Sequence, residues 1–86
     1  MHNKFTAVSE GLPELVDEKF IIGLGVVKQS KCCVIKTKNN SMQIGFYREV
    51  IENGVPVRGW WLFYEPTSDI DNDGIRIFNV VRWLSI

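Results

Sequence analysis

The segment from Met42 to Tyr64 decides the fold, and it reads MQIGFYREVIE, then NG, then VPVRGWWLFY. Both flanks are rich in β-branched and aromatic residues, which favour strands. Asn53-Gly54 supplies the two residues with positive φ that a type I′ turn requires. The segment therefore predicts a β-hairpin with strands at Met42–Glu52 and Val55–Tyr64.

The tight turn also predicts the register of this hairpin, because a two-residue connection fixes which residues face each other. Pro56 should face Ile51 in a non-hydrogen-bonded pair, where the N–H that proline lacks is not needed. No further strand should pair with the other edge of the Val55–Tyr64 strand at Pro56. Favourable cross-strand pairs then follow along the hairpin: Glu49–Arg58, Tyr47–Trp60, Phe46–Trp61 and Ile44–Phe63.

The two faces of the hairpin differ in composition. We expect one face in the core, and it carries Ile44, Phe46, Val50, Val57, Trp61 and Phe63. The other face carries Gln43, Tyr47, Glu49, Arg58, Trp60, Leu62 and Tyr64. This second face is too aromatic for an ordinary solvated surface. Either another element of the chain covers it, or it binds a partner.

Turn-forming residues recur roughly every ten residues on both sides of the hairpin, as in all-β domains. Upstream, we expect strands at Phe5–Val8, Phe20–Lys28 and Cys32–Lys38, with a bend or bulge at Gly23 and Gly25. Turns should lie at residues 9–13, 29–31 and 39–41, and a short helical turn at residues 14–18. Downstream, Ile75–Ile86 should return as the last strand.

These elements predict one domain, residues 1–86, that is mainly β. We expect a small antiparallel β-barrel or SH3-like roll of roughly five to seven strands, since closure removes exposed strand edges. Hydrophobic residues make up 45% of the chain and aromatic residues 12%, which is enough for a small core.

The formal net charge is zero, which argues against a whole-protein attraction to nucleic acid. The charges are nevertheless unevenly spread. Residues 19–48 contain no acidic side chain but contain Lys19, Lys28, Lys31, Lys36, Lys38 and Arg48. This segment either forms a local basic surface or places lysines at solvated strand edges, where they prevent edge-to-edge pairing.

The remaining chemistry points to a cytoplasmic protein without an active site. No long apolar stretch follows Met1-His2-Asn3-Lys4, so we expect neither a signal peptide nor a membrane span. Cys32 and Cys33 are adjacent, which excludes a disulfide framework and suits a reducing compartment. His2 is the only histidine and lies at a terminus, so no nucleophile–base pair, zinc site or other cofactor site is predicted.

The loop Asp69-Ile70-Asp71-Asn72-Asp73-Gly74 begins like a calcium-binding loop, with carboxylates at alternate positions before a glycine. The position where such loops carry a bidentate glutamate is Val80, and a strand rather than a helix is expected after it. We therefore interpret this segment as a solvated turn without a metal.

Three segments resemble a small domain family of unknown function that is common in phages and prophages. Residues 5–13, FTAVSEGLP, resemble its opening W-x-x-V-S-E-x-L-P. Gly45-Phe46-Tyr47-Arg48 with Gly59-Trp60 resembles its central strands, and residues 80–85, VVRWLS, resemble its closing V-T-H-W-M-P-L. Phe5 stands for the usual Trp, and Arg82 for the usual His. The resemblance implies a viral or prophage accessory protein acting in the cytoplasm of a bacterial host, and it transfers no site residues.

Three classes of function remain open. The first is a non-catalytic protein-interaction module that modulates a host factor, or a homodimer, through Tyr47, Arg58, Trp60, Leu62 and Tyr64, since aromatic residues and arginine are frequent hot spots. The second is a small-barrel protein that binds single-stranded nucleic acid through Lys28, Lys31, Lys36, Lys38 and Arg48. The third, an enzyme or metal protein, depends only on the acidic loop.

Overall fold

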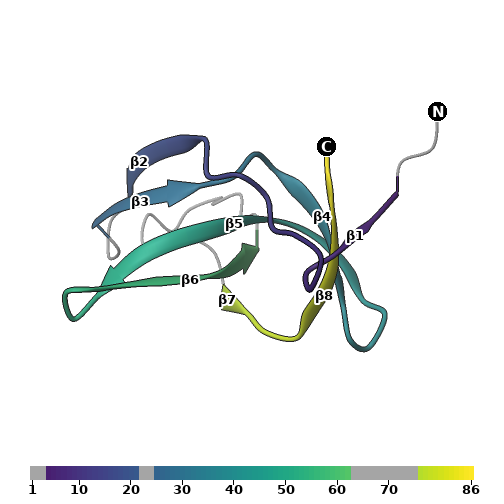
Figure 1. The fold of residues 1–86 in the computed structure, drawn as a ribbon. Coiled ribbons are helices and arrows are strands. Elements are labelled where there is room, and N and C mark those ends of the chain that lie inside the picture. Colours follow the sequence, from purple (N-terminus) through teal and green to yellow (C-terminus); the bar gives the residue numbers. More distant parts are fainter. Residues whose placement is uncertain (1–3, 22–24, 63–75) are drawn as a thin grey trace, which may run out of the picture.

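The computed structural model describes residues 4–21, 25–62 and 76–86, and all elements in this part of the chain are strands (Figure 1). They form one antiparallel sheet that does not close into a barrel. The mainly β prediction is confirmed. The strands, more numerous than predicted, are β1 (Thr6–Ala7), β2 (Asp17–Ile21), β3 (Gly25–Gln29), β4 (Cys33–Thr37), β5 (Met42–Glu52), β6 (Val55–Leu62), β7 (Arg76–Ile77) and β8 (Val80–Ser85).

The β5–β6 hairpin has the predicted turn and register. Asn53 and Gly54 both have positive φ, 52° and 79°, as a type I′ turn requires. Four of the predicted pairs are present: Glu49–Arg58, Tyr47–Trp60, Phe46–Trp61 and Ile51–Pro56. The fifth pair, Ile44–Phe63, cannot be compared because Phe63 lies outside the described residues. Tyr64 and the acidic loop of residues 69–74 lie outside them as well.

The segment upstream of the hairpin differs from its prediction. Phe20–Lys28 is not one long strand, because the chain reverses between Ile21 and Gly25, which pair with each other in a β2–β3 hairpin. Gly25 has a φ of 81°, a conformation that favours glycine. The helical turn expected at residues 14–18 is also absent, since Asp17 and Glu18 begin β2.

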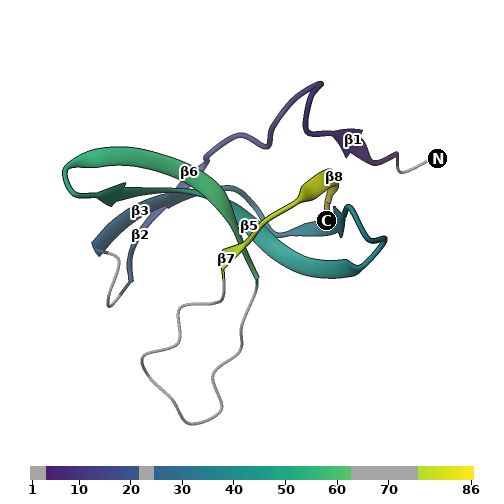
Figure 2. The same ribbon diagram turned by 90° about the horizontal axis from the view of Figure 1, so that it is seen from below.

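The final strand is divided as well. Asn79, with a φ of 64°, separates β7 from β8. β7 pairs with β6 at Trp60–Trp61, whereas β8 pairs with β4 and β1. Within residues 76–85 the chain therefore runs from the end of β6 to the side of the molecule that holds β1 and β4, as Figures 1 and 2 show.

A β-bulge at Ser30 organises the sheet. β3 and β4 pair with the same edge of β5, and the register shifts by one residue between Gln29–Arg48 and Cys33–Gly45. Ser30 fills the gap, because its N–H donates to the Tyr47 carbonyl at 2.8 Å and its Oγ accepts from the Tyr47 N–H at 3.0 Å. Residues 29–31 thus continue along β5 rather than turning, and the side chains of β4 change face relative to those of β3.

This change of face produces two small cores on opposite sides of the hairpin. One core contains Val27, Val50 and Trp61, with Ile21 and Val57 packed against them. The other contains Cys33, Ile35, Tyr47 and Trp60, against which Val8, Leu15, Ile77, Val80 and Trp83 pack. Both faces of the long hairpin are therefore used for packing within the chain.

Candidate functional site

The aromatic surface predicted on the hairpin is not available to a partner. Tyr47 and Trp60 are only 6% and 7% exposed, and their ring centroids lie 5.0 Å apart inside the core. The prediction of an interaction surface around these two residues is wrong, because they form a core with Cys33 and Ile35, against which Val8 and Leu15 from the segment after β1 also pack. Trp83 holds that segment in place, since its Nε1 donates to the Gly11 carbonyl at 2.9 Å.

The other residues predicted for that surface do not form a binding site. Arg58 is exposed and donates through Nε to Glu49 Oε2 at 2.9 Å. This hydrogen bond raises the pKa of Arg58 above its ordinary value. Leu62 is half-buried, and Tyr64 lies outside the described residues.

The cations predicted to contact nucleic acid are not gathered in one groove. Lys28 lies on the face of the sheet that carries Glu49, whereas Lys36 lies on the opposite face beside Met42. Lys31 and Lys38 are exposed on the segments that flank β4. Arg48 is 3% exposed, so its assignment as a nucleic-acid contact is wrong.

Arg48 instead has a structural role inside the protein. Its Nε and Nη2 donate to Gln29 Oε1 at 3.1 and 2.9 Å, and its guanidinium carbon lies 5.4 Å from the Trp61 ring centroid. From β7, where it pairs with Trp61, Arg76 lies 5.1 Å from the same ring and 5.2 Å from that of Phe78. A buried arginine needs such hydrogen bonds and ring contacts to offset its loss of hydration.

An exposed sheet face on β8, β4 and β5 is the strongest candidate site. Cross-strand pairing arranges its side chains in two parallel rows, Arg82–Lys36–Met42 and Leu84–Val34–Ile44. We call these six residues the outer face. Met42 and Ile44 are 58% and 48% exposed, whereas Val34 and Leu84 are half-buried. The outer face therefore offers an apolar area with two cations, Lys36 and Arg82, along one side.

Sequence reasoning missed this surface. It placed Ile44 in the core with Phe46 and Trp61, because all three alternate along one face of the hairpin. Only the end of that face near Val50 is covered, while at Ile44 the same face is open among the described residues. The alternation in Cys33-Val34-Ile35-Lys36 was the available signal, since its outward residues are Val34 and Lys36.

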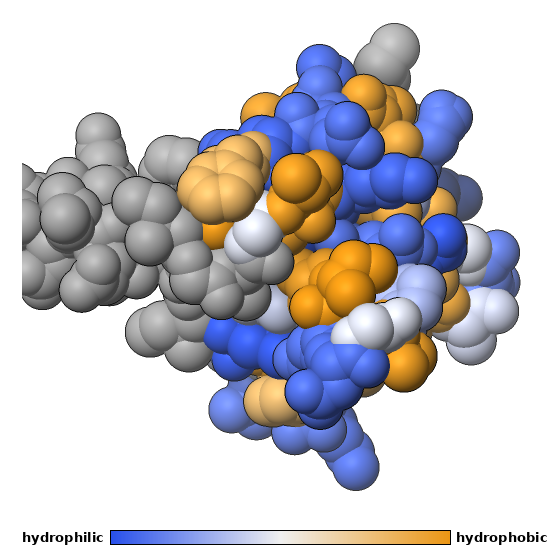
Figure 3. All heavy atoms as spheres, turned by 90° about the vertical axis from the view of Figure 1, so that its left-hand side faces the viewer, coloured by the Kyte–Doolittle hydropathy of each residue, from blue (hydrophilic) through white to orange (hydrophobic). Residues whose placement is uncertain are grey.

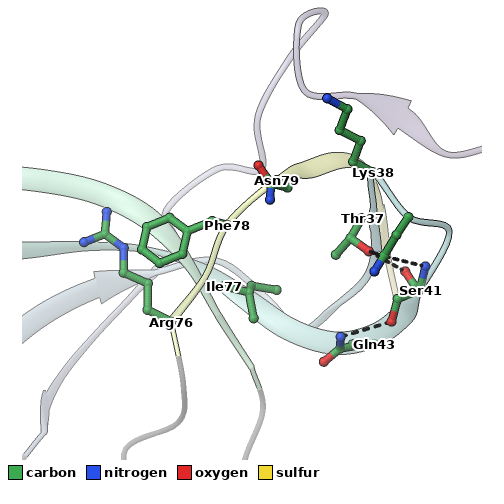
Figure 4. Close-up of a pocket in the computed structure, with 9 residues that line it drawn as sticks. Thr37, Lys38, Ser41, Gln43, Arg76, Ile77, Phe78 and Asn79 are labelled. Carbon is green, nitrogen blue, oxygen red and sulfur yellow. Dashed lines mark hydrogen bonds between the residues drawn. The ribbon is translucent and has the colours of Figure 1, made fainter.

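A pocket of about 540 Å³ lies between the loop after β4 and the β7–β8 connection (Figure 4). Thr37, Ser41 and Gln43 form one wall and are joined by hydrogen bonds among themselves and with Asn39. The charged ends of Lys38 and Arg76 point in different directions, and that of Arg76 lies beside the Phe78 ring (Figure 4). The two cations therefore do not converge on one ligand.

Metal and thiol chemistry find no support in the part of the chain that is described. It contains no group of histidine, cysteine, aspartate or glutamate side chains arranged to hold a metal ion. Cys32 and Cys33 are both free thiols. Burial raises the pKa of both cysteines, although a hydrogen bond with Ser30 partly opposes this effect at Cys33. A raised pKa favours the unreactive neutral thiol at neutral pH.

Comparison with known proteins gives no match, whether with models of protein families, with curated proteins or with solved structures. Among the described residues, no helix could span a membrane.

Proposed function

We propose that this protein is a non-catalytic binding protein whose outer face holds an acidic, apolar segment of a protein partner. The observation that carries the proposal is the composition of that face: four apolar side chains and two cations, with no acid among the six. Exposed apolar area attracts a partner, and the cations select one that carries carboxylates.

The outer face suits a protein better than a nucleic acid. Sites for single-stranded nucleic acid present aromatic side chains on which bases stack. The outer face presents Met42 and Ile44 instead, and Tyr47 and Trp60 are buried on the other side of β5. The cations of residues 19–48 are divided between two faces, which weakens the electrostatic case for a nucleic-acid ligand.

The resemblance to a phage and prophage family supports a further part of the proposal. The partner would then be a protein of the bacterial host, and the chain would act in the host cytoplasm by covering a surface of that protein. The segments that carry the resemblance meet in the fold, because Thr6 and Ala7 pair with Trp83 and Arg82, and Trp83 packs against the Tyr47–Trp60 core.

A binding assay with synthetic peptides tests the proposal. We expect the full chain to bind a fluorescent peptide of alternating leucine and glutamate, and not the same peptide with lysine in place of glutamate. Ile44→Asp should weaken binding by about 10-fold or more, since it places a charge at the centre of the face. Lys36→Glu should weaken it by a similar factor at low salt, and less at high salt.

Two variants control for indirect effects in this assay. Val55→Asp changes an aliphatic residue of similar exposure, 56%, at the far end of the hairpin. Lys19→Glu changes an exposed cation on β2. Both should leave binding unchanged. Absence of binding to the acidic peptide, equal binding to the lysine peptide, or preferential binding of a single-stranded oligonucleotide at low salt would each contradict the proposal.

A further inference from the structure

A row of four charged residues crosses the sheet at the end where both hairpins turn, away from the outer face. Cross-strand pairing sets its order as Glu18–Lys28–Glu49–Arg58, from β2 through β3 and β5 to β6. We call it the charge row. The signs alternate along it, and of its four members only Glu49 and Arg58 form an ion pair with each other.

An apolar row lies on the same face, two positions nearer the hairpin tips. It contains the pairs Phe20–Val26 and Ile51–Pro56. Phe20, Val26 and Ile51 are 69%, 58% and 53% exposed. Figure 3 looks onto this end of the molecule and shows apolar side chains gathered between hydrophilic ones. Exposed apolar side chains at three positions of one sheet face, two of them cross-strand partners, indicate a contact surface rather than scattered surface residues.

The order of charges makes this face complementary to a copy of itself. A twofold axis parallel to the strands places the face of one copy against that of another and reverses the order across the strands. Glu18 then faces Arg58 of the second copy, and Lys28 faces its Glu49. The apolar row meets the apolar row of the second copy in the same arrangement. Glu18 and Lys28, which form no ion pair within the described chain, would each gain an opposite charge.

We propose that the protein forms a homodimer through the charge row and the apolar row. The contact is face to face, because the outer edge of β2 carries Asp17, Glu18 and Lys19, and charges there disfavour edge-to-edge pairing. This surface is distinct from the buried Tyr47–Trp60 pair and from the outer face. The dimer therefore leaves the outer face of each copy free for a partner.

Sedimentation equilibrium of the full chain over a range of concentrations tests this dimer. The average mass should rise from the monomer value of 9.9 kDa toward twice that value. Lys28→Glu and Glu49→Lys should each weaken association by about 10-fold or more, since each places like charges opposite each other at two symmetric positions. An equimolar mixture of these two variants should recover dimers, because each unlike pair restores opposite charges.

Recovery by mixing separates the interface from any effect on folding, because a misfolded variant is not repaired by its counterpart. Lys19→Glu, a matched reversal on the other face of β2, should leave the mass curve unchanged, as should Ile44→Asp on the outer face. A wild-type mass that stays at 9.9 kDa, single variants that associate like the wild type, or a mixture that stays monomeric would overturn the dimer.

Discussion

Replacing Gly45 by alanine should reduce the free energy of unfolding by about 3 kcal/mol or more, a large share of the stability of a small domain. Gly45 lies where β5 pairs with β4 on one edge and with β6 on the other. A Cβ at this position would collide with the Trp61 carbonyl oxygen and would also lie 2.7 Å from Ile35 Cδ1, closer than van der Waals contact allows. The backbone oxygen cannot move without breaking the β5–β6 pairing, so no small side-chain adjustment can relieve the collision.

Urea denaturation of Gly45→Ala beside Gly11→Ala measures this effect. Gly11 is the matched control, because a Cβ there would meet nothing within 4 Å and its φ does not lie in the left-handed region. Gly11→Ala should change the free energy of unfolding by about 0.5 kcal/mol or less. Equal stability of the two variants would show that β5 and β6 do not approach each other at Gly45 as described.

Replacing Trp60 by alanine should reduce the free energy of unfolding by about 3–5 kcal/mol, the usual range for a large aromatic residue in a core. Trp60 is 7% exposed and packs against Tyr47, Cys33 and Ile35. Its removal leaves a cavity among the side chains of β4, β5 and β7. The expected phenotype is loss of folding, rather than loss of a contact with a partner.

Phe78→Ala is the control for the loss of an aromatic ring. Phe78 is 66% exposed and lies against the Arg76 guanidinium, so its removal should reduce the free energy of unfolding by no more than about 1 kcal/mol. Thermal or urea unfolding followed by circular dichroism compares the two variants. If Trp60→Ala were as stable as Phe78→Ala, Trp60 would be a surface residue.

The part of the fold that sequence predicts is the part fixed by local chemistry. Asn53-Gly54 determines the turn, the turn determines the register, and Tyr47–Trp60 and Glu49–Arg58 follow. No local rule places the bulge at Ser30, because its hydroxyl substitutes for a backbone acceptor opposite Tyr47, seventeen residues away in the chain. The division of β2 from β3 was hidden for a similar reason. Phe20–Lys28 is apolar on both sides of the reversal, and Gly25 is compatible with a bend as well as with a hairpin.

The candidate site was missed because the same hairpin face is buried at one end and open at the other. Val50 is 1% exposed and Ile44, on the same side of β5, is 48% exposed. Alternation along a strand identifies which residues share a face, but burial depends on which other strands reach that face. Along β5, β3 is the neighbouring strand as far as Arg48, and β4 is the neighbour from Gly45 onward. The face of β5 that is buried therefore changes at the bulge between them.

The most direct test of the account is a two-dimensional ¹H–¹⁵N NMR titration of the full chain with the leucine–glutamate peptide. We predict that the amide signals of Val34, Ile44 and Leu84 shift progressively, while the indole signals of Trp60 and Trp61 stay in place. This result would place binding on the outer face and leave the hairpin aromatics in the two cores. Shifts concentrated at the Trp60 indole and around Tyr47, with Ile44 unchanged, would contradict the account.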